Sequence, residues 1–250
     1  MLDAAMRSHP TLMEAEQGTV STPLRAVVLG VGGLGCPAVL ALLAAGVRDF
    51  VLVDGDRVDT SNLQRQVLFC GADAGRPKTE AARTFILQRA PDAHVECVDR
   101  ALVFDEVEDW IAALDAEQLV FECTDAPGLK FAVNDACVHL GRPVVIGGVL
   151  GWIGRVLGVA PGRACYRCYF EAPPPRNLAP SCATAGVLGA AAGVMGAWMA
   201  AVGHGLRSDP QVHGGRLYAM DLVRLRPQVL HSAPRERCPA CQRAPTTGFT

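Results

Sequence analysis

The feature that most constrains this chain is a glycine-rich turn between two short apolar runs. The first run, 26–29, leads into Gly30-Val31-Gly32-Gly33-Leu34-Gly35 and an Ala/Leu-rich segment at 38–45, and the second run, 50–53, ends at Asp54. Strand, glycine turn, helix, strand and acidic residue, in this order, are typical of a nucleotide-binding βαβ unit. In such a unit backbone N–H groups of the turn bind phosphate, and the acidic residue binds a ribose hydroxyl. The predicted nucleotide contacts are therefore Gly30, Gly32, Gly33, Gly35 and Asp54.

Composition and charge make several classes of protein unexpected. Half of the 250 residues are hydrophobic and 19% are charged, which predicts a packed globular core. The formal net charge of −2, without a long basic run, argues against nucleic acid as a partner. The N-terminus lacks the basic start and apolar core of a signal peptide, so we expect a cytoplasmic protein. The uncharged segment 183–203 is mostly Ala and Gly, and we expect a helix buried in protein, not a membrane span.

Short apolar runs alternate with helical patterns along most of the chain, which predicts a parallel sheet with helices on both faces. After residue 148 the pattern changes, and 152–159 and 217–229 read as strands on either side of the Ala/Gly helix. The predicted fold is α/β, a Rossmann-like, doubly wound and mostly parallel sheet with additional C-terminal antiparallel strands. We expect an N-terminal arm at 1–24 and a single domain at 25–250. The expected strands are 26–29, 50–53, 95–98, 119–121 and 144–146, and the expected helices are 12–17 (weak), 38–45, 79–89, 106–114 and 129–140.

A polar loop after Asp54 indicates what the bound nucleotide is used for. Asp56, Asn62 and Arg65 lie in this loop, and Lys78 follows it after a Gly-Arg-Pro tripeptide. The carboxyl ends of the strands carry the site in an open α/β sheet, and cations placed there would neutralise charge on a leaving pyrophosphate. The alternatives are a solvated surface loop and, for the glycines, an ordinary tight turn.

Two further residues are candidates for chemistry. Asp125 follows the apolar run 119–121 and could hold Mg²⁺ against phosphate oxygens; its alternative role is a helix N-cap. Cys182 precedes the Ala/Gly helix, whose positive dipole end would lower the pKa of a thiol and favour a nucleophile. The alternative for Cys182 is an inert residue at a loop–helix junction.

Four of the ten cysteines form two Cys-x-x-Cys pairs that are far apart in the chain. Two such pairs predict a tetrahedral four-thiolate zinc site in a cytosolic thiol protein. With no His ligand evident, the zinc would be structural and would clip the C-terminal segment to the rest of the domain. The alternatives are two redox dithiols or a coincidence of spacing. The predicted ligands are Cys165, Cys168, Cys238 and Cys241.

Together these residues resemble the ThiF/MoeB/HesA family, which are bacterial relatives of the ubiquitin-activating enzyme. The resemblance rests on the glycine turn, on the run Ser61-Asn62-Leu63-Gln64-Arg65-Gln66 and on Gly75-x-x-Lys78. Cys123-Thr124-Asp125 and the two cysteine pairs complete the match, which covers nearly all of residues 25–241. The Ser-Asn-Leu-Gln-Arg-Gln run and the Cys-Tyr-Arg-Cys pair make it specific.

The resemblance implies ATP-dependent adenylation of the C-terminal glycine of a small ubiquitin-like sulfur carrier protein ending in Gly-Gly, such as ThiS or MoaD. It implies that Asp54 binds the ribose and that Asp125 binds magnesium. Asn62, Arg65 and Lys78 are then the phosphate contacts. The resemblance also implies zinc on the paired cysteines and a homodimer.

Four comparisons with the family pattern refine this expectation. Family members carry an Arg-Tyr-x-Arg-Gln run on an N-terminal helix, from which an arginine reaches the partner's ATP, whereas the first 24 residues here contain only Arg7. Asp125 is followed by Ala126, where Asn is usual. Cys182 is similar to a cysteine that in some members joins the carrier covalently. We see no rhodanese-like extension, and therefore expect an external sulfur donor.

The expected reaction is an in-line attack of the carrier's terminal carboxylate on the α-phosphate of ATP, with loss of pyrophosphate. The carboxylate is ionised at pH 7, so no general base is required, and Arg65, Lys78 and Mg²⁺ on Asp125 would neutralise the growing charge. An external persulfide, or Cys182 as a relay, would then take the acyl group. The alternatives are an NAD-dependent oxidoreductase, a zinc-bearing binding module without activity, and adenylation of another peptide or protein C-terminus in natural-product biosynthesis.

Overall fold

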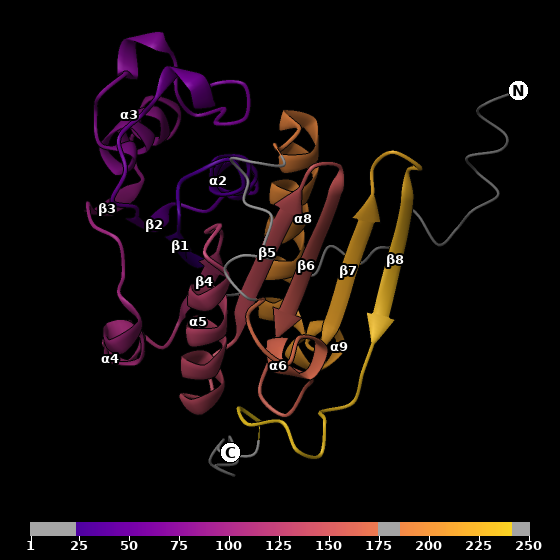
Figure 1. The fold of residues 1–250 in the computed structure, drawn as a ribbon. Helices are drawn as coiled ribbons and strands as arrows, with labels where there is room; N and C mark the ends of the chain where they lie inside the picture. The colour runs from indigo at the N-terminus through magenta and orange to yellow at the C-terminus, as the bar shows by residue number, and fades with distance from the viewer. Residues whose placement is uncertain (1–23, 175–185, 242–250) are drawn as a thin grey trace, which may run out of the picture.

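The predicted apolar runs pair into one eight-stranded sheet with the order β3-β2-β1-β4-β5-β6-β7-β8 (Figure 1). The computed structural model describes residues 24–174 and 186–241, so all of the expected N-terminal arm except Leu24 lies outside the described residues. Strands β1 to β5 pair in parallel, and β5 to β8 pair antiparallel, which confirms the predicted α/β fold. The strands are β1 (Arg25–Leu29), β2 (Asp49–Val53), β3 (His94–Val98), β4 (Gln118–Glu122), β5 (Val144–Leu150), β6 (Ile153–Val159), β7 (Arg216–Asp221) and β8 (Arg226–His231).

Helices cover both faces of the sheet and bury it between two hydrophobic clusters. On one face α2, α3 and α8 pack over a cluster that includes Val28 and Phe50. On the other face α4 and α5 pack over Val27 and Val51. Alternate residues of a strand point to opposite faces, so a strand covered on both sides is apolar throughout. The helices are α2 (Gly35–Ala44), α3 (Lys78–Arg89), α4 (Val107–Ala112), α5 (Pro127–His139), α6 (Tyr166–Tyr169), α8 (Gly189–Ser208) and α9 (Pro210–His213), with 3-10 turns η2 (Thr60–Asn62), η3 (Gly71–Asp73) and η4 (Phe104–Glu106).

The order of the strands reverses between β1 and β4. The chain runs outward from β1 through β2 to β3, then returns to place β4 on the other side of β1. In open α/β sheets ligands bind in the crevice that such a reversal leaves at the carboxyl ends of the strands. Gly30 follows β1, Asp54 follows β2 and Cys123 follows β4 at this edge, so the fold itself brings the predicted motifs together.

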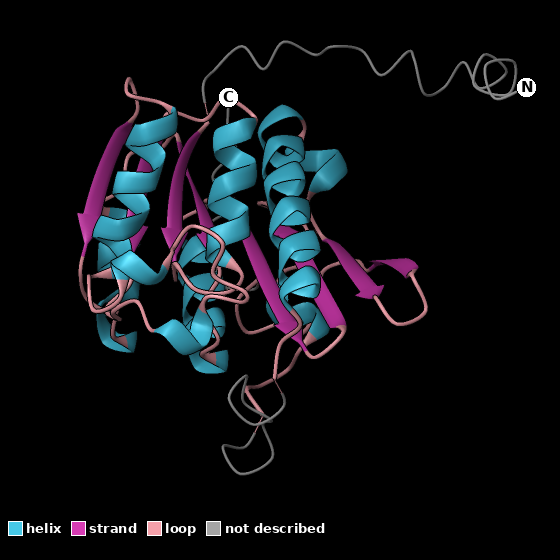
Figure 2. Ribbon diagram, turned by 90° about the horizontal axis from the view of Figure 1, so that it is seen from above, coloured by secondary structure: helices cyan, strands magenta, loops and turns pink. Residues whose placement is uncertain are grey.

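The C-terminal third differs in detail from the prediction. β5 extends beyond Ile146 because it pairs antiparallel with β6 along its whole length. A two-residue turn joins these strands, with Gly151 at a φ of +56°. The region 217–229 is not one continuous strand: it belongs to two strands, β7 and β8, which pair as a hairpin. The hairpin forms one side of the sheet and projects beyond the helices there (Figure 2).

The Ala/Gly helix, α8, packs against α2 and against β5 and β6. It begins later than the predicted segment 183–203, because Gly186 has a φ of +71° and Val187 forms a β-bridge with Gly151 before the helix starts. Met195, Met199 and Leu206 are buried by this packing, whereas Val194 is 40% exposed, so α8 is buried along one side and not on all sides as expected. No helix in the described part of the chain is long and apolar enough to cross a membrane.

The close contact between α8 and α2 predicts different effects of alanine at two glycines of α8. A Cβ at Gly196 would lie 2.7 Å from the backbone nitrogen of Ala38 and 2.9 Å from the carbonyl oxygen of Leu34, whereas a Cβ at Gly193 would meet no atom within 4 Å. Gly196→Ala should therefore lower the free energy of unfolding by about 2 kcal/mol through overpacking. Gly193→Ala should leave it unchanged or raise it by up to about 1 kcal/mol through helix propensity. Urea unfolding followed by circular dichroism measures both changes, and equal effects would contradict this packing.

Candidate active site

A cavity of about 800 Å³ opens at the carboxyl edge of the sheet, over the reversal between β1 and β4. Its wall is formed by the glycine turn, the loop after β2, the start of α3, the turn after β4, and residues of β5 and β6. The structure therefore gathers residues that the sequence places in separate segments. The predicted site residues that line the cavity are Gly30, Gly32, Gly33, Asp54, Asp56, Asn62, Arg65, Lys78 and Asp125.

The glycine turn depends on close backbone contacts. Gly30 has a φ of +88°, in the left-handed region that favours glycine. A Cβ at Gly35 would lie 1.9 Å from the carbonyl oxygen of Gly30, so only glycine lets the turn close onto the start of α2. Gly35 therefore shapes the turn, while the other three predicted glycines line the cavity. A Cβ at Gly33 would lie 3.1 Å from Cδ of Arg65, which shows that the arginine stem lies across the turn.

Asp54 links the glycine turn to the loop that follows β2. Its Oδ2 accepts a hydrogen bond from the backbone N–H of Val31 at 2.7 Å, and its Oδ1 accepts one from the backbone N–H of Asp56 at 2.8 Å. The Nζ of Lys78 lies 3.8 Å from the same Oδ1. Burial raises the pKa of Asp54, and the charge of Lys78 opposes that shift. Two backbone hydrogen bonds thus orient the carboxylate at the position predicted to meet a ribose.

The two cations of the polar loop have polar partners beside the glycine turn. Lys78 is 5% exposed, and its Nζ lies 2.7 Å from Oδ2 of Asp56. The guanidinium of Arg65 donates a hydrogen bond to Oδ1 of Asn62. Lysine is seldom buried without such a partner. The alternative of a freely solvated surface loop is therefore wrong for Lys78, which is buried and paired. It also does not fit Arg65, because its guanidinium is hydrogen-bonded to Asn62.

Asp125 lies in the turn after β4 and lines the cavity. Helix α5 begins at Pro127, with Ala126 at the cap position and no side-chain hydrogen bond to the helix end. The alternative role of Asp125 as a helix cap is therefore not what the structure shows. A carboxylate in the wall of this cavity suits a hard cation such as Mg²⁺, which takes one or two protein carboxylates together with phosphate oxygens.

The sequence analysis missed a buried network beside Asp125. Glu122 ends β4 and is fully buried, and its carboxylate accepts hydrogen bonds from Nζ of Lys130 and from the hydroxyl and backbone N–H of Thr124. Lys130 is 8% exposed and also donates to the carbonyl oxygen of Gly147 at 2.6 Å. The network joins β4, β5 and α5, and it fixes the turn that carries Asp125. An acidic residue at the end of an apolar run, followed by a lysine in the next helix, was its signal in the sequence.

Three further polar residues line the cavity that the sequence analysis did not name as site residues, although Gln66 belongs to the run 61–66. Gln66 is 3% exposed, and its Oε1 has no hydrogen-bond partner among the described residues. Arg100 forms an ion pair with Glu106. Arg155 lies in the middle of β6. Arg155 reaches the cavity through the tertiary fold, because it lies within a strand and not at its carboxyl end.

The four paired cysteines converge into one cluster although 73 residues separate Cys165 from Cys238. Their Sγ atoms all lie within 4.8 Å of one another. The distance is 3.6 Å between Cys165 and Cys238 and 3.7 Å between Cys168 and Cys241. Four thiolates bound tetrahedrally at the usual Zn–S length of about 2.3 Å lie about 3.8 Å apart. The cluster could therefore hold zinc, and it is a single site, not two separate dithiols.

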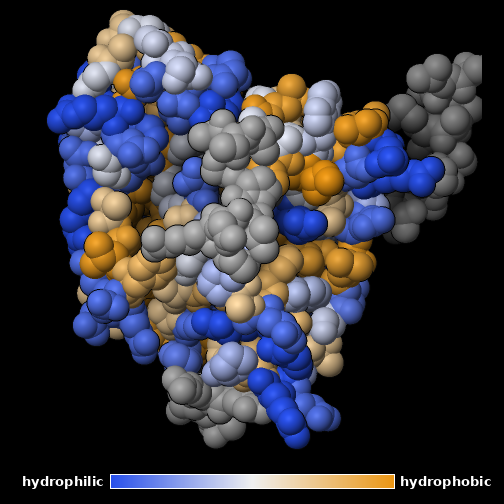
Figure 3. Space-filling model, in the orientation of Figure 1, coloured by the Kyte–Doolittle hydropathy of each residue, from blue (hydrophilic) through white to orange (hydrophobic). Residues whose placement is uncertain are grey.

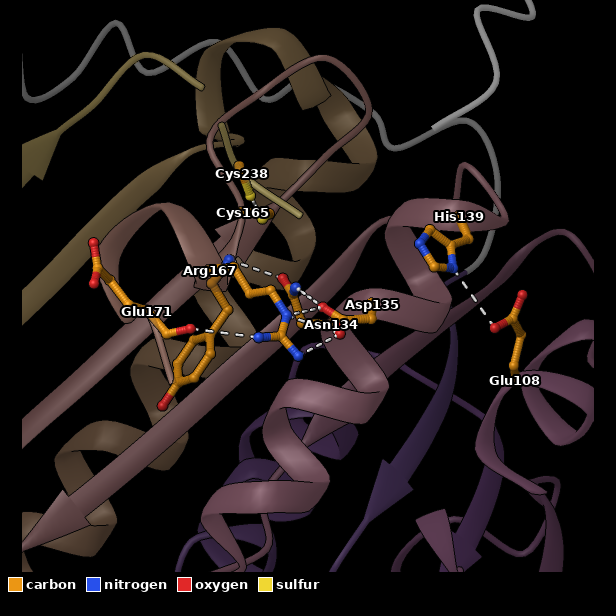
Figure 4. Close-up of polar contacts among 9 residues, drawn as sticks. Glu108, Asn134, Asp135, His139, Cys165, Arg167, Glu171 and Cys238 are labelled. Carbon is orange, nitrogen blue, oxygen red and sulfur yellow. Dashed lines mark hydrogen bonds and ion pairs between the residues drawn. The ribbon is translucent and has the colours of Figure 1, made fainter. Parts of the chain in front are cut away.

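Polar contacts tie the cysteine cluster to α5 (Figure 4). Oδ1 of the buried Asn134 accepts a hydrogen bond from the backbone N–H of Tyr166 at 2.8 Å. Nε of Arg167 lies 2.7 Å from Oδ1 of Asp135, and its terminal nitrogen lies 2.7 Å from Oδ2. Tyr166 and Arg167 are the two residues within the first Cys-x-x-Cys pair. Because Tyr166 also lines the cavity, the cluster supports one part of the cavity wall.

Cys182 lies outside the described residues, so its role stays a prediction. The described part of α8 begins at Gly189, several residues beyond Cys182. The favourable effect of a helix dipole falls off within the first turn. The argument that this helix lowers the pKa of Cys182 therefore loses its basis.

The buried network predicts that Glu122→Gln is strongly destabilising. Burial raises the pKa of Glu122 and the charge of Lys130 opposes that shift, so the substitution would leave a buried lysine without its counter-charge. Removing one partner of a buried pair costs about 3–5 kcal/mol, and we expect a loss of about 3 kcal/mol in the free energy of unfolding. The control is Asp92→Asn, which breaks an exposed 3.6 Å pair with Arg48 and should cost less than about 1 kcal/mol. Guanidinium unfolding measures both, and a similar small loss for the two variants would contradict the role of the network.

Solved structures with this fold include crystal structures of MccB from E. coli. The structure of MccB with ATP has a TM-score of 0.74 and 21% sequence identity, and the match covers 88% of this chain and 67% of that chain. A second structure of MccB has a TM-score of 0.75 and 20% identity, covering 91% of this chain and 67% of that chain. At this level of identity the likeness shows the fold.

Other proteins share more sequence identity with this chain than these solved structures do. The SAMP-activating enzyme E1 of Haloferax volcanii is 36% identical over 218 residues, which is 87% of this chain and 80% of the relative. The sulfur carrier protein ThiS adenylyltransferase of E. coli K12 is 35% identical over 219 residues, 86% of this chain and 84% of the relative. The adenylyltransferase and sulfurtransferase MOCS3 of Drosophila grimshawi is 39% identical over 70% of this chain, which spans 38% of that relative. The model of the ThiF family matches residues 6–240, and the chain therefore belongs to the ThiF family.

Proposed function

We propose that this protein uses ATP to adenylate the C-terminal glycine carboxylate of a small ubiquitin-like sulfur carrier protein, which activates the carrier for sulfur transfer. The observation that carries the proposal is one cavity that combines a glycine turn, a partly buried Asp54, and the cations Arg65 and Lys78. Membership of the ThiF family supports an adenylyltransferase. The relatives named as a ThiS adenylyltransferase and a SAMP-activating enzyme support a carrier protein as the substrate.

In this proposal the nucleotide phosphates lie over the glycine turn and the ribose lies beside Asp54. Backbone N–H groups at the start of α2 bind the phosphates. Arg65 and Lys78 neutralise the charge that grows on the leaving pyrophosphate. The side chain of Asp56 is 75% exposed, so Lys78 can exchange this partner for a phosphate oxygen without leaving a buried carboxylate unpaired.

The terminal carboxylate of the carrier attacks the α-phosphorus in line. A new P–O bond forms to the carboxylate while the bond to the bridging oxygen of pyrophosphate breaks, which leaves an acyl-adenylate. No side chain needs to remove a proton, because the carboxylate is already ionised at pH 7. Asp125 would hold Mg²⁺, which supplies further neutralisation of phosphate charge when bound.

The proposal extends to partners and location. The carrier ends in Gly-Gly, an external donor supplies the sulfur, and Cys182 serves as a relay between the acyl-adenylate and that donor. The protein acts in the cytoplasm as a homodimer. Sulfur transfer is supported by relatives whose names include a sulfur carrier protein and a sulfurtransferase.

Pyrophosphate exchange into ATP should depend on a carrier ending in Gly-Gly, with E. coli ThiS as the probe. Arg65→Ala and Lys78→Ala should each slow exchange about a hundredfold, because each removes a charge contact worth roughly 3 kcal/mol in the transition state. Arg83→Ala is the control, since Arg83 lies on the same helix as Lys78 and pairs with Glu80 at the surface. Normal exchange in both site variants would remove these cations from the chemistry. Absence of exchange together with NADH binding would favour an oxidoreductase.

We further propose structural zinc in the cluster of four cysteines. Four thiolates at nearly tetrahedral spacing leave no open coordination position, which is typical of a structural site. The site would join the segment after β8 to the segment after β6 and thereby hold the C-terminal residues against the domain. Because the unfolded chain lacks a preformed site, the free energy of metal binding adds to the stability of the fold.

The purified protein should contain one zinc ion per chain, measured by plasma mass spectrometry. Cys241→Ser should lose the metal, and removal of zinc by a chelator should lower the free energy of unfolding by at least about 3 kcal/mol. Cys97→Ser is the control, because Cys97 is a half-buried cysteine on β3, outside the cluster. It should keep both its zinc and its stability. Full zinc content in Cys241→Ser, or unchanged stability of the zinc-free protein, would contradict the proposed site.

A further inference from the structure

Among the described residues, one cation of the cavity has neither a hydrogen-bond partner nor an ion-pair partner. Arg155 lines the cavity but forms no hydrogen bond or ion pair with a described residue. A free guanidinium in a binding cavity is a site for an anionic group. The other basic side chains of the cavity all have partners: Lys78 pairs with Asp56, Arg100 with Glu106 and Lys130 with Glu122, and Arg65 donates to Asn62.

Arg155 points to the face of the sheet that α8 does not cover. A Cβ at the neighbouring Gly154 would strike Met195 of α8, so Gly154 faces this helix and Arg155 faces away from it. In the sheet Arg155 lies opposite Gly148 on β5 and Ala219 on β7. Both partners are small, and a Cβ at Gly148 would meet no atom within 4 Å. Neither cross-strand partner therefore has a charged or polar side chain that could pair with Arg155.

The other side chains that β5, β6 and β7 place on this face are apolar, except Asp221, which pairs with Arg224 at 2.7 Å. This face is turned toward the viewer in Figures 1 and 3. Leu150 and Ile153 face each other across the turn between β5 and β6 and are 36% and 48% exposed. Leu157 and Leu217 continue the same face on β6 and β7 and also line the cavity. A single cation on an apolar floor suits an extended peptide that carries one acidic side chain among small or apolar residues.

The sheet sets the distance between Arg155 and the nucleotide end of the cavity. The glycine turn follows β1, and β6 is three strands away, which corresponds to roughly 14 Å at a spacing of about 4.8 Å per strand. An arginine side chain does not span this distance, so phosphates over the glycine turn are not its partner. An extended peptide, at about 3.4 Å per residue, crosses it in about four residues. The tail of the substrate, not the nucleotide, is the group within reach.

We propose that Arg155 binds an acidic side chain in the substrate tail, about two to four residues before the terminal carboxylate, and thereby selects substrates with acidic tails. The inference rests on the proposed function, because the nucleotide fixes the end of the tail. A guanidinium binds a carboxylate through two parallel hydrogen bonds, and the attraction is stronger over an apolar floor than in bulk water. A basic residue at the same position of the tail would be repelled, so Arg155 both favours acidic tails and rejects basic ones.

Versions of E. coli ThiS with Glu, Gln or Lys at each of the three positions before the terminal Gly-Gly test this inference. In pyrophosphate exchange, the wild-type protein should prefer Glu over Lys at least tenfold in kcat/KM at one of these positions, with Gln between them. Arg155→Gln should abolish the preference, and Arg155→Glu should reverse it. A purely structural role of Arg155 would slow all three versions equally and would not reverse the order.

The matched control is Arg226→Gln. Arg226 is an exposed arginine on β8, away from the cavity. It lies on the same face of the sheet as Arg155, because cross-strand pairing connects it through Asp221 to Ile153. This variant should keep the wild-type preference. Equal use of the Glu, Gln and Lys versions by the wild-type protein, or a preference that survives in Arg155→Glu, would overturn the inference.

Equilibrium binding of the same ThiS versions, fluorescently labelled, separates this inference from the proposed function. If no version supports exchange but the Glu version binds at least tenfold more tightly than the Lys version and this difference reverses in Arg155→Glu, the adenylation proposal fails and the inference stands. If exchange occurs but neither exchange nor binding distinguishes the versions, the adenylation proposal stands and the inference fails.

Discussion

The carboxylate of Asp54 holds together the three segments on which the cavity depends. It accepts the backbone N–H of Val31 in the glycine turn and that of Asp56 in the next loop, and it lies 3.8 Å from Nζ of Lys78. Without this acceptor a partly buried N–H group would lose its partner, at a cost of about 1–3 kcal/mol. Asp54 directly follows β2, whose last residue, Val53, pairs with Leu29 of β1. The position of the carboxylate is therefore set by strand register, which is the most rigid feature of the fold.

The distribution of charge divides the cavity into two ends. On the side of β1, β2 and β4, Lys78 and Lys130 are both nearly buried, and each has an acidic partner. Burial of an ion pair is weak evidence for stability, because desolvation offsets much of the attraction, so these pairs are better understood as positioning devices. On the side of β6, Arg155 has no partner in the described part of the chain and lies beside the apolar side chains of Ile153 and Leu157. A nucleotide suits the first end, and the tail of a second substrate suits the other.

The antiparallel strands and the loop of the cysteine cluster form the second end of the cavity, beyond the parallel strands. β6 and β7 extend the sheet beyond the reversal where the nucleotide would bind, so that one continuous surface leads from the glycine turn to the outer strands. Asn134 and Asp135 of α5 hold the loop between the first two cysteines. The same loop supplies Tyr166 to the cavity wall. A C-terminal clip far from the glycine turn thus helps to shape the site.

The sequence by itself determined the local elements and the residues that follow strand ends. The glycine turn, Asp54 and Lys78 could be placed in one site because periodic apolar runs define the strands, and parallel strands present their carboxyl ends at one edge. Only the tertiary structure decided that the region 217–229 contributes to a hairpin, that Glu122 and Lys130 form a buried pair, and that Arg155 has no partner within 24–174 and 186–241. The pairing and burial of a charge depend on the packing of elements that are distant in the chain, so a local pattern can suggest such a pair but does not establish it.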